Sequence, residues 1–356
     1  MTNDNRPYMD YFKSVPKTGV IYVIDKAIEA GYHPDSDDWV NLGQGAPETG
    51  SFNGKAVNHV VTIDEKSSEY AAVSGRDDLK EEIANYYNTM FRQGKSSHYT
   101  KDNICITGGG RLALSRVVTA LGNINLGHFI PDYTAYEELL GMFKTFNPFP
   151  ILIEPENGYK IHPEELKKEI VGRGLSSLLI SNPCNPTGQV LMGDDLNEWV
   201  TIAKALDCLM IFDEFYSHFI YDKPGKILSS AEYIDDVNKD SVIIINGLTK
   251  NWRCPGWRIG WIVGPEPIIE KVSSVGSFLD GGAVHPLQQE AIKLLNPDKV
   301  KKDAAIIQEK FKEKRDYTVT KLKEMGFVIE EAPTAAFYVW VNLEKLPTPL
   351  QDCFDL

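Results

Sequence analysis

The feature that most constrains this chain is a repeated alternation of short apolar runs with amphipathic segments. Seven runs are candidate strands, and helical periodicity separates most of them. Short strands that alternate with helices predict an α/β fold, in which a largely parallel sheet is covered on both faces. The predicted strands span 103–107, 128–131, 149–154, 177–182, 208–213, 241–246 and 258–264, and the predicted helices include 77–91, 134–146, 162–171 and 194–206.

The same pattern suggests three regions. We expect residues 1–45 to form an N-terminal arm that contributes to a small domain, and residues 46–285 to form the large domain that holds the sheet. We expect residues 286–356 to form the rest of this small α+β domain, with a charged helix at 298–325 and a strand at 335–343. Because the chain stops soon after that strand, we expect the small domain to be truncated. Ligands in sheets of this kind bind beyond the carboxyl ends of the strands.

Charge and cysteine content narrow the possible partners and location. A net charge of −13 argues against binding to nucleic acid or to an anionic membrane. No CxxC pair occurs, so we expect reduced thiols, no disulfide framework and no metal site. Residues 1–13 lack the apolar core of a signal peptide, and no apolar run reaches the roughly 18 residues of a membrane helix. A cytoplasmic location is therefore expected. The cysteines are Cys105, Cys184, Cys208, Cys254 and Cys353.

Polar motifs follow several predicted strands. The strand 177–182 leads into NPCNPTG, and the strand 208–213 ends in DEFY. The strand 241–246 leads into GLTK and then NWRCPGWRIG. Together, in this order and at this spacing, the motifs resemble the class I/II aminotransferases, which are fold-type-I enzymes that depend on pyridoxal 5′-phosphate. The resemblance extends from about residue 40 to residue 343. It implies a mostly parallel seven-stranded sheet with a smaller domain built from both ends of the chain.

The resemblance assigns the cofactor contacts to five side chains. Lys250 would hold the cofactor as a Schiff base, which suits a lysine whose pKa is lowered by desolvation. Asp213 would pair with the protonated pyridine nitrogen, and Arg258 would bind the phosphate through its planar guanidinium. Tyr216 and Asn185 would hydrogen-bond the ring hydroxyl, and Asn185 would also contact the substrate carboxylate.

The TGGGRLAL motif follows the strand 103–107 and begins a helix. Backbone amides at such a helix start can bind an anion, so Gly109, Gly110 and Arg111 are expected at the phosphate. Arg111 stands where the family usually has a small or amide residue, which leaves the role of its side chain open. Gly247 replaces a serine that the family usually carries before the cofactor lysine, whereas Thr249 keeps a hydroxyl beside it.

Three further residues match family positions. Tyr133 matches the aromatic residue that stacks on the cofactor ring. Tyr70 matches a tyrosine that reaches the phosphate of the neighbouring subunit, which implies a homodimer with shared active sites. Gly45 matches a backbone contact to the substrate. No residue matches the arginine that binds the substrate carboxylate, because the family carries it beyond the point where this chain ends.

The function expected first is transfer of an amino group from an amino acid to a 2-oxo acid, with Lys250 moving the proton. An alternative is an amino-acid oxidase of the arginine-oxidising type, or a lyase, because the phrases at 213–221, 247–252 and 278–288 look somewhat closer to that branch. His218 would then be a residue to mutate. A non-catalytic cofactor-binding protein is the third hypothesis. A nucleotide hydrolase is disfavoured, because Thr89 stands where a GxxxxGK[ST] motif needs glycine.

Overall fold

The structure is a computed structural model, and it describes residues 15, 19–51, 59–344 and 346–348. Residues 1–13 and Cys353, on which two sequence predictions fall, lie outside the described residues. The chain divides into two compact units, Met1–Gly45 and Ala46–Leu356. The first unit contains helix α1 (Gly19–Glu29), of which no residue is buried. After α1, the ring of Tyr32 meets the edge of Trp39 at a centroid distance of 5.9 Å.

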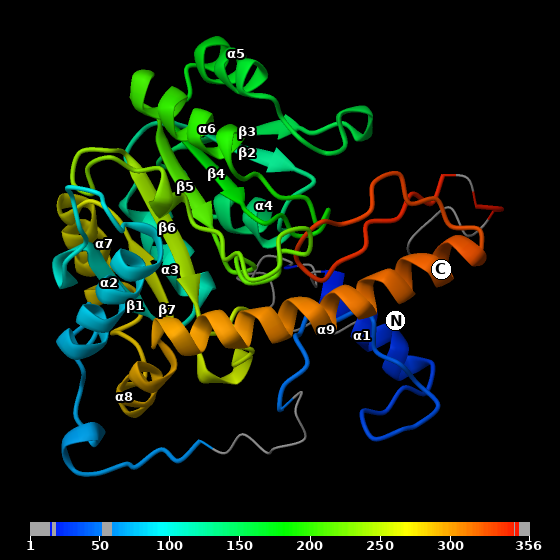
Figure 1. The fold of residues 1–356 in the computed structure, drawn as a ribbon, viewed down its shortest axis with the longest axis horizontal. Coiled ribbons are helices and arrows are strands. Elements are labelled where there is room, and N and C mark those ends of the chain that lie inside the picture. Colours follow the sequence, from blue (N-terminus) through cyan, green and yellow to red (C-terminus); the bar gives the residue numbers. More distant parts are fainter. Residues whose placement is uncertain (1–14, 16–18, 52–58, 345, 349–356) are drawn as a thin grey trace, which may run out of the picture. The chain divides into compact units, whose positions relative to one another are not determined.

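The second unit is built on a seven-stranded sheet (Figure 1). Its order is β1-β7-β6-β5-β4-β2-β3, and β7 pairs antiparallel with both β1 and β6, whereas the other pairs are parallel. The mostly parallel α/β fold predicted from the sequence is therefore confirmed. The strands are β1 (Ile104–Thr107), β2 (Asn125–Ile130), β3 (Asn147–Leu152), β4 (Ser177–Ser181), β5 (Leu209–Asp213), β6 (Val242–Gly247) and β7 (Gly260–Val263).

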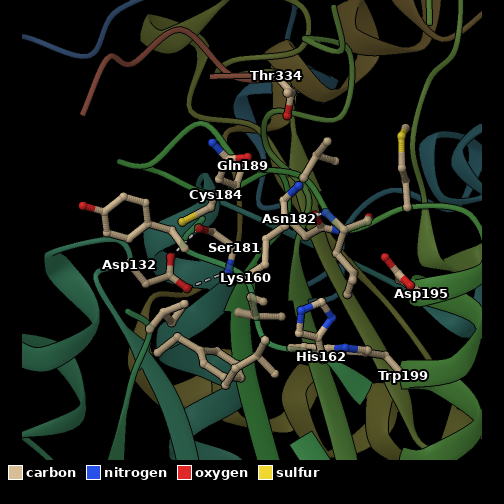
Figure 2. Close-up of a pocket in the computed structure, with 18 of the residues that line it drawn as sticks. Asp132, Lys160, His162, Ser181, Asn182, Cys184, Gln189, Asp195, Trp199 and Thr334 are labelled. Carbon is tan, nitrogen blue, oxygen red and sulfur yellow. Dashed lines mark hydrogen bonds between the residues drawn. The ribbon is translucent and has the colours of Figure 1, made fainter. Parts of the chain in front are cut away.

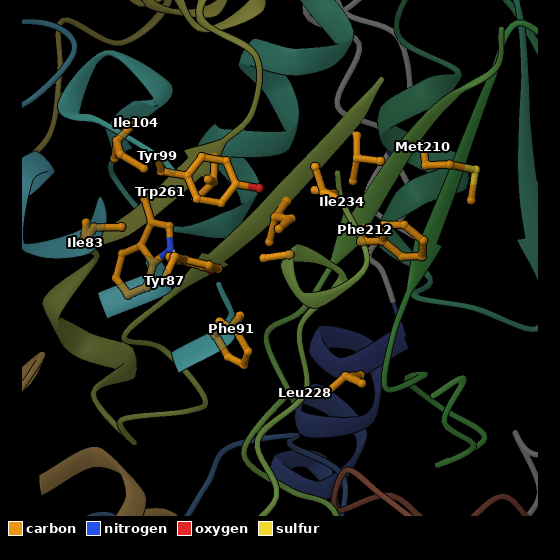
Figure 3. Close-up of a cluster of buried hydrophobic side chains, with 14 of the residues drawn as sticks. Ile83, Tyr87, Phe91, Tyr99, Ile104, Met210, Phe212, Leu228, Ile234 and Trp261 are labelled. Carbon is orange, nitrogen blue, oxygen red and sulfur yellow. The ribbon is translucent and has the colours of Figure 1, made fainter. Parts of the chain in front are cut away.

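Helices cover both faces of the sheet, and an apolar core lies on each face. One core packs α2 (Asp77–Phe91), α5 (Pro163–Arg173) and α6 (Asp194–Ala205) against the sheet, and Figure 3 shows part of it around Phe212 and Trp261. The other packs α3 (Gly110–Ala120), α4 (Ala135–Leu140) and α7 (Glu266–Leu279) against the opposite face, which includes Ile262. Neighbouring residues of one strand serve opposite cores because side chains alternate along a strand.

Two further helices complete the described part of the chain, α8 (His285–Ala291) and α9 (Pro297–Glu324). The predicted helix at 298–325 is thus present. Within the described ranges, no helix is long and apolar enough to span a bilayer. The connections contain short 3-10 helices, namely η2 (Lys66–Ser68), η3 (Lys101–Asn103), η4 (Pro155–Asn157), η5 (Ser230–Glu232), η6 (Pro255–Trp257) and η7 (Ile292–Leu294).

Two sequence predictions of local structure were wrong. No strand forms at 335–343, where one was expected, and the bridges that this segment makes to other described residues are only Ile220–Ala335 and Val328–Asn342. The reason is that Ala336 adopts a left-handed conformation (φ 55°), which interrupts extended backbone. The helix expected at 134–146 ends at Leu140, where Gly141, a poor helix former, follows.

The strand register brings the polar motifs to one edge of the sheet. Asp213 lies opposite Ser181 on one side and Ile245 on the other, so β4 and β5 end at the same level and β6 continues beyond them to Gly247. Gly247 pairs with Gly260, and a Cβ atom at position 247 would lie 2.6 Å from the Gly260 Cα. This close approach explains why a serine is replaced by Gly247, since a larger residue has no room there.

Candidate active site

Lys250 lies in the turn that follows β6, at the carboxyl edge of the sheet. Its Nζ atom is 5.7 Å from the centre of the Phe337 ring. Burial lowers the pKa of the Lys250 amine to about 8, and the charges of Arg111 and Arg258 act in the same direction, whereas Asp213 opposes them. About a tenth of this amine is therefore uncharged at pH 7 and can act as a nucleophile.

The neighbouring Asn251 fixes the loop that carries the lysine. Its buried amide Nδ2 donates to the Glu214 carbonyl oxygen at 3.0 Å and to Asn246 Oδ1 at 2.9 Å. His218 donates its backbone N–H to Asn251 Oδ1 at 3.0 Å, and its ring packs on Trp252 at a centroid distance of 4.7 Å. Burial lowers the pKa of His218 to about 3, so this ring is neutral and serves to anchor the loop.

Asp213 ends β5 and receives two hydrogen bonds. The Tyr136 hydroxyl donates to its Oδ2 at 2.9 Å, and the Phe215 backbone N–H donates to its Oδ1 at 3.3 Å. Burial raises the pKa of Asp213 to about 6, and both hydrogen bonds and the charge of Lys250 oppose that rise. A cationic ring nitrogen at this carboxylate would supply the charge partner that a buried anion needs.

Three side chains form a hydrogen-bonded chain beside the lysine. Asn185 Nδ2 donates to the Tyr216 hydroxyl at 3.3 Å, and the hydroxyl groups of Tyr216 and Tyr338 are 2.6 Å apart. Burial raises the pKa values of both tyrosines, that of Tyr338 to about 12. Both phenols are therefore protonated near neutral pH and can donate hydrogen bonds.

The start of α3 meets Arg258 at the same edge. Gly109 precedes α3 with φ 97°, and a Cβ atom there would lie 2.3 Å from the Arg258 guanidinium. Arg258 is itself left-handed (φ 54°), a conformation that is costly outside glycine and typical of functional sites. The Thr249 hydroxyl oxygen is buried and has no hydrogen-bond partner among the described residues. A phosphate could accept hydrogen bonds from the amides at the start of α3, the Arg258 guanidinium and the Thr249 hydroxyl.

The side chains of Arg111 and Tyr133 are paired. Arg111 Nε donates to the Tyr133 hydroxyl at 3.2 Å, and the Tyr133 ring meets the edge of Tyr136 at 5.5 Å. The backbone of the preceding glycine is covered by another aromatic ring, since a Cβ atom on Gly110 would lie 2.5 Å from Phe215. The predicted residues at the ends of β1, β2, β4, β5 and β6 and before β7 are thus brought to one edge of the sheet.

These residues fit a pyridoxal phosphate in three respects. The unpartnered Thr249 hydroxyl and the glycine turn at Gly109 suit the phosphate, and the partly buried Asp213 carboxylate suits a ring nitrogen. The amine of Lys250 has the lowered pKa that reaction with an aldehyde requires.

Two predicted site residues are not joined to this group. Tyr70 is 97% exposed, and its predicted contact is with a second subunit. Gly45 belongs to the first unit, so its predicted substrate contact stays a prediction.

Sequence reasoning missed three aromatic residues at the site, namely Tyr136, Phe337 and Tyr338. Tyr136 is the second tyrosine of PDYTAY, and its nearness to Tyr133 in that motif is the signal that could have indicated it. Phe337 and Tyr338 come from a segment far along the chain from Lys250, and no local pattern in the sequence connects the two.

A separate cavity of 260 Å³ lies beside the site (Figure 2). Asp132 and Ser181 line it from the ends of β2 and β4, and the Ser181 N–H donates to Asp132 Oδ2 at 3.1 Å. Burial raises the pKa of Asp132 to about 7. The cavity also contacts Trp199 of α6, whose indole nitrogen is buried and finds no hydrogen-bond partner in the part of the chain that the structure describes.

Comparison with known proteins gives consistent matches. The family model described as aminotransferase class I and II matches residues 37–352. An aspartate aminotransferase of Sulfolobus acidocaldarius is 26% identical over 316 residues, which are 86% of this chain and 74% of that protein. One of Bacillus subtilis is 27% identical over 330 residues, 90% and 78% of the two chains. The solved aspartate aminotransferase from Thermus thermophilus with maleate has a TM-score of 0.77 at 20% identity, covering 95% of this chain and 87% of that one.

Proposed function

The chain belongs to the class I and II aminotransferases, and we propose that Lys250 is its catalytic lysine, with pyridoxal 5′-phosphate as its cofactor. The observation that carries this proposal is the convergence of Lys250, Asp213 and Tyr216 at the carboxyl ends of the neighbouring strands β5 and β6. When bound, pyridoxal phosphate would supply an electron-withdrawing ring that stabilises negative charge on the substrate α-carbon.

The residues would divide the work of holding the cofactor. Arg258, Thr249 and the amides near Gly109 and Gly110 would hold the phosphate, and Asp213 would keep the ring nitrogen protonated. Tyr133 would pack on the ring, and Arg111, which donates to its hydroxyl, would fix that ring in place. Tyr216 and Asn185 would bind the ring hydroxyl.

Lys250 would have two tasks. Its Nζ would first hold the cofactor covalently and would then be released by the incoming amino group of the substrate. The free amine, with a pKa lowered to about 8, would accept a proton from the substrate α-carbon and return it to the cofactor side. The adjacent ring of Phe337 would help to exclude water from this transfer.

The substrates would be an amino acid and a 2-oxo acid. Asn185 and Gly45 would contact the substrate. The relatives described above are named aspartate aminotransferases, so aspartate is the first amino acid to test. Those names support transamination over the arginine-oxidising hypothesis. His218, the residue singled out for that hypothesis, is buried and engaged with Asn251.

We also infer a homodimer in the cytoplasm. Tyr70 is 97% exposed. The residue before it, Glu69, has its backbone oxygen 3.0 Å from His285 Nδ1. Close to His285 in the sequence, Phe278 is 73% exposed. Such exposed aromatic rings favour a subunit interface, where Tyr70 would reach the neighbouring phosphate. The free cysteines among the described residues support a reducing compartment.

A half-reaction under anaerobic conditions tests the proposed function. The cofactor-loaded protein would be mixed with single amino acids, including aspartate and arginine, while absorbance and 2-oxo acid release are followed. We expect one equivalent of 2-oxo acid per site and conversion of the cofactor to its amine form. Lys250→Ala is the negative control. No 2-oxo acid without oxygen, followed by product and peroxide when air is admitted to the same mixture, would contradict transamination.

A further inference from the structure

The hydroxyl of Tyr216 has more potential partners than hydrogen atoms. A phenol donates one hydrogen and accepts up to two. Asn185 already donates to the Tyr216 oxygen at 3.3 Å, and the Tyr338 hydroxyl lies 2.6 Å away. In that short contact, either tyrosine can be the donor. If Tyr216 donates to Tyr338, it has no hydrogen left for a cofactor.

An anionic ring oxygen beside Tyr216 decides between these arrangements. A hydrogen bond to an anion is about twice as strong as one between neutral groups. Tyr216 therefore donates to the anion, and Tyr338 must donate to Tyr216. Donation by Tyr338 also polarises the Tyr216 hydroxyl, which strengthens its own hydrogen bond because successive bonds in a chain reinforce one another.

We propose that Tyr338 is a positioning residue that donates to the Tyr216 oxygen and thereby directs the Tyr216 hydroxyl hydrogen to the ring oxygen of the cofactor. This inference rests on the proposed function. Tyr338 would act through Tyr216 rather than by touching the cofactor itself.

The backbone around Tyr338 is held firmly enough for this role. The N–H groups of Thr334 and Ala335 donate to the Gly188 carbonyl oxygen at 3.0 and 2.9 Å. The Ala336 N–H donates to the Phe219 carbonyl oxygen at 2.9 Å. The segment is thus tied both to the loop that carries Asn185 and to the loop that carries Tyr216.

Aromatic packing fixes the ring as well. The ring of Tyr338 meets the edge of Tyr216 at a centroid distance of 5.5 Å and packs on Phe337 at 5.0 Å. Phe337 in turn contacts Phe219 and Phe311. Tyr338→Phe keeps this packing and removes only the hydroxyl, so it separates the proposed role from a structural one.

The first test is the pH midpoint of the absorbance of the bound cofactor. Donation to the ring oxygen stabilises its anion, so weaker donation makes the bound chromophore hold its proton to higher pH. We expect Tyr338→Phe to raise the midpoint by about half a pH unit, and Tyr216→Phe to raise it more. In the Tyr216→Phe background, Tyr338→Phe should have no further effect. Tyr159→Phe, which removes a hydroxyl bonded to Glu330, is the control.

A second test does not depend on Tyr216→Phe folding. Tyr338→Phe should weaken binding of pyridoxal phosphate by about threefold, yet leave binding of 3-deoxypyridoxal phosphate, which lacks the ring hydroxyl, unchanged. Three results would overturn the role of Tyr338 alone. They are an unchanged pH midpoint, equal shifts of the midpoint in both backgrounds, or equally weakened binding of the two ligands. Failure of the wild-type protein to bind pyridoxal phosphate would overturn the proposed function and this inference with it.

Discussion

The Tyr136 hydroxyl donates a hydrogen bond to Oδ2 of Asp213 over 2.9 Å, and the tyrosine is only 1% exposed. This contact joins the first turn of α4 to the carboxyl end of β5. Burial raises the pKa of Asp213, and this hydrogen bond lowers it, so Tyr136 helps to keep the carboxylate ionised. An ionised Asp213 is what a protonated ring nitrogen requires.

Removal of this hydroxyl should weaken cofactor binding. Tyr136→Phe raises the pKa of Asp213 further and leaves the carboxylate with one donor fewer. We expect pyridoxal phosphate to bind about threefold to tenfold more weakly at pH 7, as measured by fluorescence titration of cofactor-free protein. Tyr317→Phe, on the exposed part of α9, is the matched control. Unchanged affinity in Tyr136→Phe would contradict the expected role.

Asp213 should reduce the stability of the cofactor-free protein. Its pKa is raised from 3.8 to about 6 in the fold, so its stabilising contribution is present below pH 3.8 and is lost as pH rises through 6. At pH 8 the wild type therefore carries a buried charge that Asp213→Asn lacks. We expect urea unfolding at pH 8 to show the variant more stable by on the order of 1–2 kcal/mol. At pH 5 the gain should shrink, and an equal gain at both pH values would refute the explanation.

The lowered pKa of Lys250 should appear in the rate of aldehyde capture. Only the neutral amine reacts, so the rate at which cofactor-free protein captures pyridoxal should rise with pH, with a midpoint near 8. Arg111→Gln should raise the midpoint, because the Arg111 charge lowers the pKa of Lys250. Pyridoxal lacks the phosphate, so loss of a phosphate contact cannot cause the change. Arg173→Gln on α5 is the control, and an equal midpoint in both variants would be evidence against the prediction.

Gly188 should be needed for the contact between the Asn185 loop and the segment that carries Tyr338. Its φ is 69°, and a Cβ atom there would lie 2.3 Å from the Pro333 Cβ. Gly94 has a similar φ of 78°, but a Cβ atom on it would meet nothing within 4 Å. We therefore expect Gly188→Ala to destabilise the fold by about 1–3 kcal/mol more than Gly94→Ala in urea unfolding. Equal losses would show that backbone conformation alone matters.

The sheet and half of the site could be predicted because their signals are local. Apolar runs mark the strands, Asp213 ends one strand, and Lys250 lies in the turn after the next, where the carboxyl ends of the strands meet at one edge. The resemblance to a family supplied the roles of these side chains. From the sequence, Gly247 could be recognised only as a departure from the serine that is usual in the family. The approach of Gly260 from β7 could be seen only once the strand register was known.

The other half of the site depends on contacts between distant segments. Tyr338 is 122 positions from Tyr216 in the sequence. The left-handed conformation of Ala336 interrupts the extended strand that was expected at 335–343. The hydrophobic pattern predicts that such a segment is buried, but it does not predict which side chain faces which loop. Tyr136 was missed for a simpler reason, because a buried aromatic residue on a short helix is usually part of the core.

Reductive trapping of the cofactor tests the central claim most directly. The purified protein, loaded with pyridoxal phosphate, would be treated with borohydride, digested and analysed by mass spectrometry. We predict a single modified peptide with the reduced cofactor on Lys250, together with a visible absorbance band that is lost in Lys250→Ala. A cofactor trapped mainly on another lysine, or a band that persists in Lys250→Ala, would contradict the assignment of Lys250.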